Sequence, residues 1–107
     1  MENMTKVVRY FRKNRREDVV IYVRGNNEAM QEIICKLYAV DNGYRVNYVT
    51  RHLEDVNLCD IMLVADPSRI SRDRMKYEKI VRDLKARGIE VESVAKDNSD
   101  IHDIFTA

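Results

Sequence analysis

One apolar stretch of the sequence decides the fold, Asp18-Val19-Val20-Ile21-Tyr22-Val23. Its residues are mostly β-branched and do not alternate with polar ones, which is typical of a strand buried on both faces of a parallel sheet. A second stretch of this kind follows further along the chain, Asp60-Ile61-Met62-Leu63-Val64-Ala65. Turn residues and then a helical pattern follow each stretch, so we expect strand–helix–strand units.

Periodicity predicts the remaining elements. Helices are expected from Asn27, as N-cap, to about residue 41 and from about Ser71 to Arg87, and two further strands at 44–49 and 89–94. The first helix is expected to pack through one apolar face, formed by Met30, Ile33, Ile34, Leu37 and Tyr38. Right-handed crossovers then give an α/β domain at residues 18–107, a three-layer arrangement with a mostly parallel four-stranded sheet and helices on both faces.

Residues 1–17 form a separate segment. One helix face carries Met4, Val7, Val8 and Phe11, and the other faces carry Lys6, Arg9, Arg12, Lys13, Arg15 and Arg16. The pattern predicts a basic amphipathic N-terminal helix. Three interpretations stay open: the helix packs on the domain with its basic face in solvent, it contacts DNA phosphates through Arg9, Arg12, Lys13 and Arg16, or it lies on a membrane surface. The short apolar stripe disfavours the membrane.

Composition excludes several classes of protein. The chain has 107 residues, enough for one core, and a formal net charge of +1, so no bulk field attracts nucleic acid or membrane.

The two cysteines, Cys35 and Cys59, lie in apolar stretches without metal-ligand spacing and are expected to be buried thiols in a reducing compartment. No apolar run could span a bilayer and no signal-type core is present, so a cytoplasmic location is predicted. No metal or cofactor motif is recognised.

The ends of the two apolar strands carry the candidate site. In open α/β sheets, ligands bind beyond the carboxyl ends of the strands. The first strand is followed by Arg24-Gly25-Asn26-Asn27, and the later one by Asp66-Pro67-Ser68-Arg69-Ile70-Ser71-Arg72. If the two strands are neighbours, Arg24, Arg69 and Arg72 converge on one rim and form a phosphate site. The alternative is three surface arginines paired with Asp66, Asp73 and other carboxylates.

These segments resemble the catalytic domain of serine recombinases, the resolvases and invertases. The family's first strand ends in a Tyr-Ala-Arg-Val-Ser-Thr type of motif, where this chain has Tyr22-Val23-Arg24-Gly25-Asn26-Asn27. A Leu-Asp-Arg-Leu-Ser-Arg type of motif matches Pro67-Ser68-Arg69-Ile70-Ser71-Arg72, and the expected helix and a Gly88-Ile89-Glu90-Val91 strand follow. The resemblance covers roughly residues 18–96. It implies a resolvase-like fold, and it carries over Arg24, Arg69 and Arg72 as the arginines that surround the scissile DNA phosphate.

The departures from the family bear on catalysis. Asn26 stands at the position of the nucleophilic serine, and an amide cannot form the phosphoserine linkage to DNA. The segment before Asp60 is shorter than the family's mobile loop and helix, and the family's long dimerisation helix is not found after the fourth strand. We therefore expect no catalytic residue and no enzyme activity: a non-catalytic resolvase-like domain, a binding or regulatory module associated with DNA or with a recombinase.

Two other functions remain open. The domain could be a protein-interaction module that reuses the fold without binding nucleic acid. It could also be a degenerate phosphoryl-transfer enzyme, which would need Ser68 or Ser71 to face the arginines. A homodimer is compatible with the sequence, because the tail and the basic helix both offer apolar surface; a membrane partner is not expected.

Overall fold

The computed structural model describes residues 16–96, so the predicted helix residues Arg9, Arg12 and Lys13 and the tail lie outside the described part. The elements are β1 (Asp18–Tyr22), α2 (Glu28–Asp41), β2 (Arg45–Thr50), η1 (Leu53–Asp55), β3 (Ile61–Val64), η2 (Pro67–Arg69), α3 (Arg74–Ala86) and β4 (Glu90–Ser93). Arg16 and Glu17 have no regular secondary structure, so the predicted helix does not extend through residue 17.

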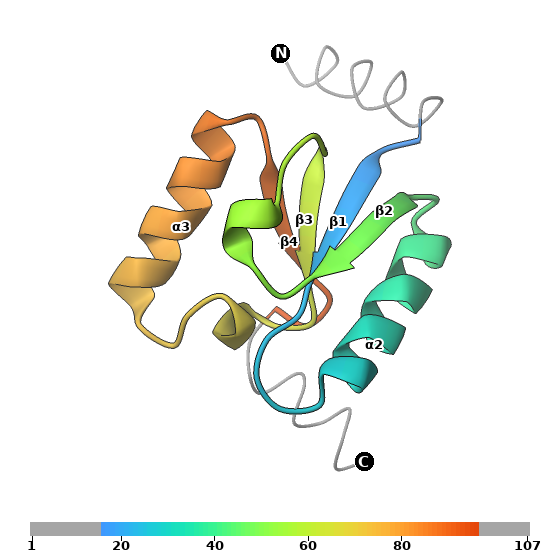
Figure 1. Cartoon of the computed structure of the whole chain (residues 1–107), viewed down its shortest axis with the longest axis horizontal. Helices are drawn as coiled ribbons and strands as arrows, with labels where there is room; N and C mark the ends of the chain where they lie inside the picture. The colour runs from blue at the N-terminus through green and yellow to red at the C-terminus, as the bar shows by residue number, and fades with distance from the viewer. Residues whose placement is uncertain (1–15, 97–107) are drawn as a thin grey trace.

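The four strands form one parallel sheet in the order β2-β1-β3-β4 (Figure 1). β1 pairs directly with β3, with Val20 opposite Met62. Because parallel strands end at the same edge of a sheet, the segments that follow β1 and β3 lie side by side. The structure thus confirms the predicted four-stranded sheet and the adjacency of the two apolar strands.

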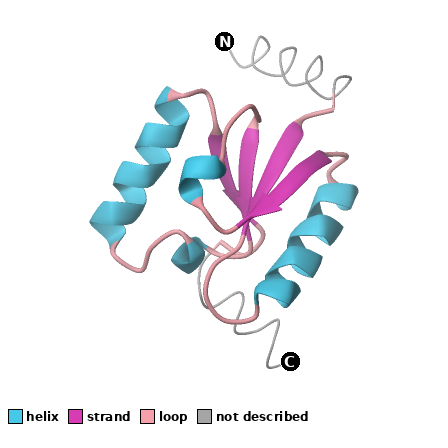
Figure 2. Cartoon of the chain, in the orientation of Figure 1, coloured by secondary structure: helices cyan, strands magenta, loops and turns pink. Residues whose placement is uncertain are grey.

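Helices cover both faces of the sheet, as Figure 2 shows. Alternate residues of β1 serve the two cores: Val19 and Ile21 pack with Cys35 and Ala39 of α2, and Val20 packs on the other face with Leu84 of α3. Residues 19–22 of β1 and all of β3 are almost completely inaccessible because layers lie above and below them. The predicted three-layer α/β architecture is confirmed.

The packing face of α2 differs from the prediction. Of the predicted face, Tyr38 packs against the core and Ile34 is half-buried, but Met30, Ile33 and Leu37 are exposed. Gln31, Cys35 and Ala39 are buried against the sheet instead. The rotation of the helix has a physical reason: the Gln31 side chain bonds the backbone of the loop that leads from β1, so this side of the helix must face inward. Asn27 occupies the N-cap position as predicted, but in the left-handed conformation (φ 62°) and without a side-chain capping bond.

α3 begins three residues later than its pattern predicts. η2 ends at Arg69, and residues 71–73 are not helical. The Asp73 side chain caps α3 by accepting from the backbone N–H groups of Met75 (2.9 Å) and Lys76 (3.2 Å). Leu84 is buried, and Tyr77 and Ile80 pack beside it. The loop between β3 and α3 therefore has a defined conformation that holds the second half of the candidate site.

Candidate functional site

The loop after β1 is held from inside the domain. Gln31, only 2% exposed, accepts a hydrogen bond from the Arg24 N–H (3.1 Å) and donates to the carbonyls of Arg24 (2.9 Å) and Asn26 (2.8 Å). Gly25, at φ 85°, adopts the left-handed backbone conformation that the turn requires. The backbone of this loop is therefore fixed, while the Arg24 side chain is exposed to solvent.

The loop after β3 is organised around one buried carboxylate. Asp66 is 1% exposed and accepts hydrogen bonds from the Ser68 N–H (2.9 Å), from the Ser68 hydroxyl and from Arg69 Nε (3.0 Å). A buried carboxylate is stable only where donors replace its lost hydration. Arg69 and Ser68 provide that replacement, so both are part of the structure of the loop.

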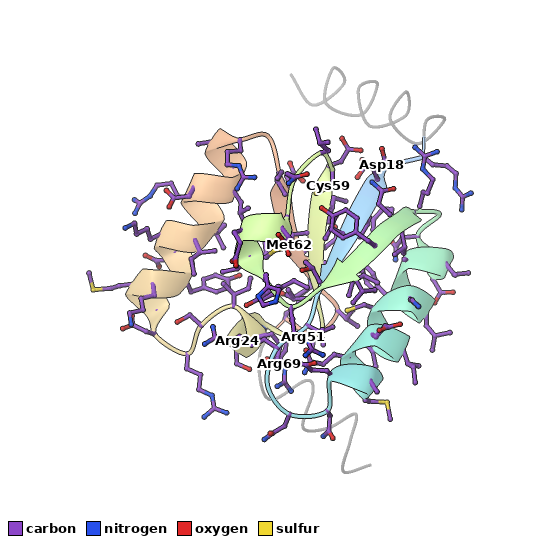
Figure 3. All side chains as sticks on the ribbon, viewed as in Figure 1. Asp18, Arg24, Arg51, Cys59, Met62 and Arg69 are labelled. Atoms are coloured by element: carbon purple, nitrogen blue, oxygen red, sulfur yellow. The ribbon has the colours of Figure 1, made fainter. Side chains whose placement is uncertain are left out.

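One contact joins the two loops. Arg69 Nη1 donates to the Arg24 carbonyl at 3.3 Å, and the Arg69 side chain is only 19% exposed. A Cβ atom at Gly25 would lie 3.2 Å from the same Nη1, so the glycine allows the guanidinium to approach closely. Figure 3 shows Arg24 and Arg69 at the carboxyl edge of the sheet. The structure brings these two predicted residues together through the backbone of one and the side chain of the other.

Arg72 stands apart from this contact. It is exposed in the loop before α3, and within residues 16–96 its side chain forms no hydrogen bond to Arg24 or Arg69. In the same part of the chain, neither Arg24 nor Arg72 has an ion-pair partner. The alternative of paired arginines holds for Arg69, which binds Asp66, but Asp73 caps α3 and binds no arginine there.

The candidate nucleophiles are placed as follows. Asn26 is exposed, and its carbonyl accepts from Gln31. The Ser68 hydroxyl donates to Asp66, and the Ser71 hydroxyl accepts from the Asp73 N–H at 3.0 Å. Both serine hydroxyls are thus engaged within their own loop.

Arg51 is a residue of this edge that the sequence analysis missed. It directly follows β2, the neighbour of β1, and its Nη2 lies 2.8 Å from Glu28 at the start of α2. It lines a cleft of about 510 Å³ together with Val23, Glu28, Ala29, Glu32, Val49, Thr50 and His52. The Val23 N–H donates to the Thr50 carbonyl at 2.9 Å, so Arg51 and Arg24 follow neighbouring strand ends (Figure 3). The sequence signal for Arg51 is that it directly follows the alternating strand. That signal points to this edge only once β2 is known to be the neighbour of β1.

Arg16 lies elsewhere. Arg16 is the one basic residue of the predicted helix that the structure describes, and it donates to the carbonyls of Gly43 and Tyr44, both at 3.4 Å. These residues precede β2, at the amino edge of the sheet. Arg16 therefore belongs to the end of the domain opposite Arg24.

The cysteines do not supply an ionised nucleophile to this edge. Cys35 is completely buried beneath it, and burial together with the charge of Asp66 raises the pKa of its thiol to about 12. Cys59 is only partly buried, which corrects the prediction of two buried thiols, and burial raises its pKa as well. Within residues 16–96 no cluster of potential metal ligands occurs, and no helix there is long and apolar enough to cross a membrane.

Comparisons with known proteins identify the fold. No family model matches the chain, and no curated protein matches its sequence. Among solved structures it is similar to the C-terminal catalytic domain of ISC1926 TnpA, an IS607-like serine recombinase, with a TM-score of 0.62 and 19% identity over 82% of this chain and 77% of that one. The domain thus has the fold of a serine recombinase catalytic domain, as the resemblance of its motifs predicted.

Proposed function

We propose that this domain is a non-catalytic, resolvase-like module that grips a DNA backbone phosphate with Arg24. The observation that carries the proposal is the loop after β1. The backbone of this loop is held by Gln31 and by Arg69. The guanidinium of Arg24 is exposed and has no ion-pair partner within residues 16–96. A fixed loop with an unpaired arginine is suited to a phosphate, because little conformational entropy is lost on binding.

Arg69 has a different role in this proposal. Its guanidinium is divided between Asp66 and the Arg24 carbonyl, so we assign it as a positioning residue that holds the loop carrying Arg24. The N-terminus of α2, which starts at Glu28, adds backbone N–H groups to the same edge.

Such a site would bind weakly by itself. Two unit charges 4 Å apart gain only about 1 kcal/mol in water, and the net charge of the chain is +1. The affinity is therefore expected to depend strongly on salt and on whatever second contact the protein makes, such as a recombinase bound to the same DNA.

The absence of catalysis rests on Asn26. At the position that matches the family's nucleophile an amide replaces a hydroxyl, and an amide cannot form a phosphoester with DNA. The enzyme alternative needs Ser68 or Ser71 to face the arginines. The Ser68 hydroxyl donates to Asp66 and the Ser71 hydroxyl accepts from the Asp73 N–H, and within residues 16–96 neither bonds an arginine, which supports the non-catalytic assignment. Incubation with supercoiled plasmid should give neither nicked DNA nor a covalent adduct; either product would overturn this half of the proposal.

A salt series tests the binding half. Fluorescence anisotropy of a labelled DNA duplex is measured between about 50 and about 200 mM salt for the wild type, Arg24→Ala and the control Arg82→Ala. Arg82 is an exposed arginine of α3, away from the edge. Loss of one phosphate contact should reduce the slope of log K against log salt by about 0.9 for Arg24→Ala only. Equal slopes for the two variants would contradict the proposal.

A protein-interaction module is the second candidate, and Arg69 favours it. The ion pair between Arg69 and Asp66 stabilises the loop whether or not phosphate is bound, so the presence of Arg69 does not require a phosphate ligand. This candidate predicts no DNA binding at the lowest salt, with the wild type and Arg24→Ala indistinguishable.

A further inference from the structure

The outward face of α2 carries a regular apolar stripe. Its members, which share one side of the helix, are Met30 (43% exposed), Ile33 (52%), Leu37 (63%) and Val40 (75%). They are four of the seven large hydrophobic side chains that are exposed within residues 16–96. The opposite side of α2 holds Gln31, Cys35 and Ala39 against the sheet, so the stripe points away from the domain. An exposed apolar patch of this kind marks an interaction surface.

The spacing of the stripe reads the same in both directions. Its successive separations are three, four and three residues, the spacing with which helices pack against each other. A second copy of α2 that runs antiparallel therefore places each member opposite another member, Met30 opposite Val40 and Ile33 opposite Leu37. The stripe is thus complementary to its own copy, as an interface with two-fold symmetry requires.

One flank of the stripe is self-complementary as well. Asn27, Ile34 and Asp41 are seven residues apart, so they lie along the same side of the helix. In the antiparallel arrangement this flank meets itself, with Ile34 at the two-fold axis and Asp41 beside Asn27 of the second copy. Asn27 is exposed and its side chain makes no capping bond. The Asp41 carboxylate would then meet an amide donor at the positively polarised end of the other helix.

The charges of α2 are compatible with this pairing. Glu28 is bound to Arg51 at 2.8 Å and Glu32 to Lys36 at 2.6 Å, so these four side chains form neutral pairs. Asp41 is the remaining charge of the helix. It is exposed at the negatively polarised end, and no basic residue occupies that last turn. A second copy supplies the positive end that Asp41 lacks in its own helix.

We propose that α2 is the interface of a homodimer, in which the helices of two copies pack antiparallel through this stripe. The inference does not depend on the phosphate site. Four side chains from each copy bury less than the about 1,200 Å² of a standard stable interface. Association is therefore expected to be reversible, with a dissociation constant of about 10–100 µM.

Sedimentation velocity of the full chain between about 10 µM and about 1 mM tests the proposal. The wild type should pass from monomer to dimer over this range. Leu37→Asp should weaken association at least about tenfold, because it places a charge inside the stripe. The matched control is Met75→Asp, which should associate as the wild type does, since Met75 is 81% exposed on α3. A wild type that remains monomeric throughout, or equal association of wild type and Leu37→Asp, would overturn the proposal.

A charge reversal separates association from folding. Asp41→Lys removes the attraction to the second copy but suits the C-terminal end of its own helix. The dimer should weaken about threefold, while the unfolding midpoint of the monomer stays the same or rises. Asp83→Lys on α3 is exposed, changes the net charge equally and should leave association unchanged. If Asp41→Lys associates as tightly as Asp83→Lys, the antiparallel arrangement is contradicted.

The orientation is tested by contacts that one chain cannot supply. Met30 and Val40 are ten residues apart, about 15 Å along one helix. Nuclear Overhauser contacts between their methyl groups must therefore come from two copies, and they are expected in the full chain at the highest concentration. A dimer without these contacts would place the interface on another surface and overturn the proposal.

Discussion

The two loops at the carboxyl edge of the sheet carry similar residues but are built in opposite ways. The loop after β3 is stabilised by its own charges, since Asp66 binds Ser68 and Arg69 of the same loop. The loop after β1 is stabilised from outside, by Gln31 of α2 and by Arg69. In the loop after β3, Arg69 is bound to Asp66 and stabilises the fold, whereas in the loop after β1 the Arg24 side chain is exposed. An arginine motif read from sequence therefore combines residues that hold the site with residues that can contact a ligand.

The largest effect is expected from removing Asp66, the buried carboxylate of the loop after β3. Asp66→Ala leaves the mostly buried guanidinium of Arg69 without its carboxylate and removes the acceptor for Ser68. We expect a loss of about 3 kcal/mol of unfolding free energy, measured by urea denaturation. Asp73→Ala, which removes only the cap of α3, is the control and should cost about 1 kcal/mol. Equal losses of unfolding free energy in the two variants would show that Asp66 contributes no more to stability than the helix cap Asp73 does.

Loss of the external support should come next. Gln31→Leu keeps the size of the side chain but leaves the Arg24 N–H and the Asn26 carbonyl without their partner, and the Arg24 carbonyl with its bond from Arg69 only. About 2 kcal/mol of stability should be lost, because buried unpaired polar groups cost about 1–3 kcal/mol. If denaturation midpoints of Gln31→Leu and wild type coincide, water replaces the amide and the loop is not held by Gln31.

Alkaline pH should weaken the core beneath both loops. The thiol of Cys35 has its pKa raised to about 12 from 9.0 by burial and by Asp66. Its contribution to stability is therefore complete below pH 9 and is lost as pH rises from 9 toward 12, since the unfolded chain releases the proton first. Between pH 9 and pH 10 the loss should be about 1 kcal/mol. In Cys35→Ala this part of the decline should be missing; an unchanged decline would contradict it.

The smallest effects separate the two arginines directly. Arg69→Ala should cost about 1 kcal/mol, because Asp66 loses its charged partner but keeps both hydrogen bonds from Ser68. Arg24→Ala removes an exposed side chain and should change stability by less than about 0.5 kcal/mol. Thermal unfolding of the two variants in one buffer measures the difference. An Arg24→Ala variant less stable than Arg69→Ala would reverse the assignment of roles.

The sequence predicted the sheet better than the helix that covers it. Apolar runs without alternation identified β1 and β3 as buried strands, whereas their adjacency was only a condition of the predicted site until the structure showed it. The orientation of α2 could not be read in the same way. Apolarity favours Met30, Ile33 and Leu37 as core, but the bonds from Gln31 to the loop determine which side faces inward, and those exist only in three dimensions.

The candidate site was predictable in its residues but not in their roles. Arg24 and Arg69 were named from the two strand ends, and the contact between them follows from the pairing of β1 with β3. The difference between their roles depends on burial, because Asp66 is buried and forms an ion pair with Arg69, three residues later. Arg51 was missed because its position at the same edge requires knowing that β2 flanks β1.

The most direct test observes the guanidinium groups themselves. Side-chain Nε–Hε resonances of arginine are recorded by NMR while a DNA duplex is added at low salt. The account predicts that the Arg24 resonance shifts with DNA and returns when salt is raised, while that of Arg82 stays in place. DNA binding that leaves the Arg24 signal unmoved, or no binding at all, would contradict the claim that this loop presents its arginine to phosphate.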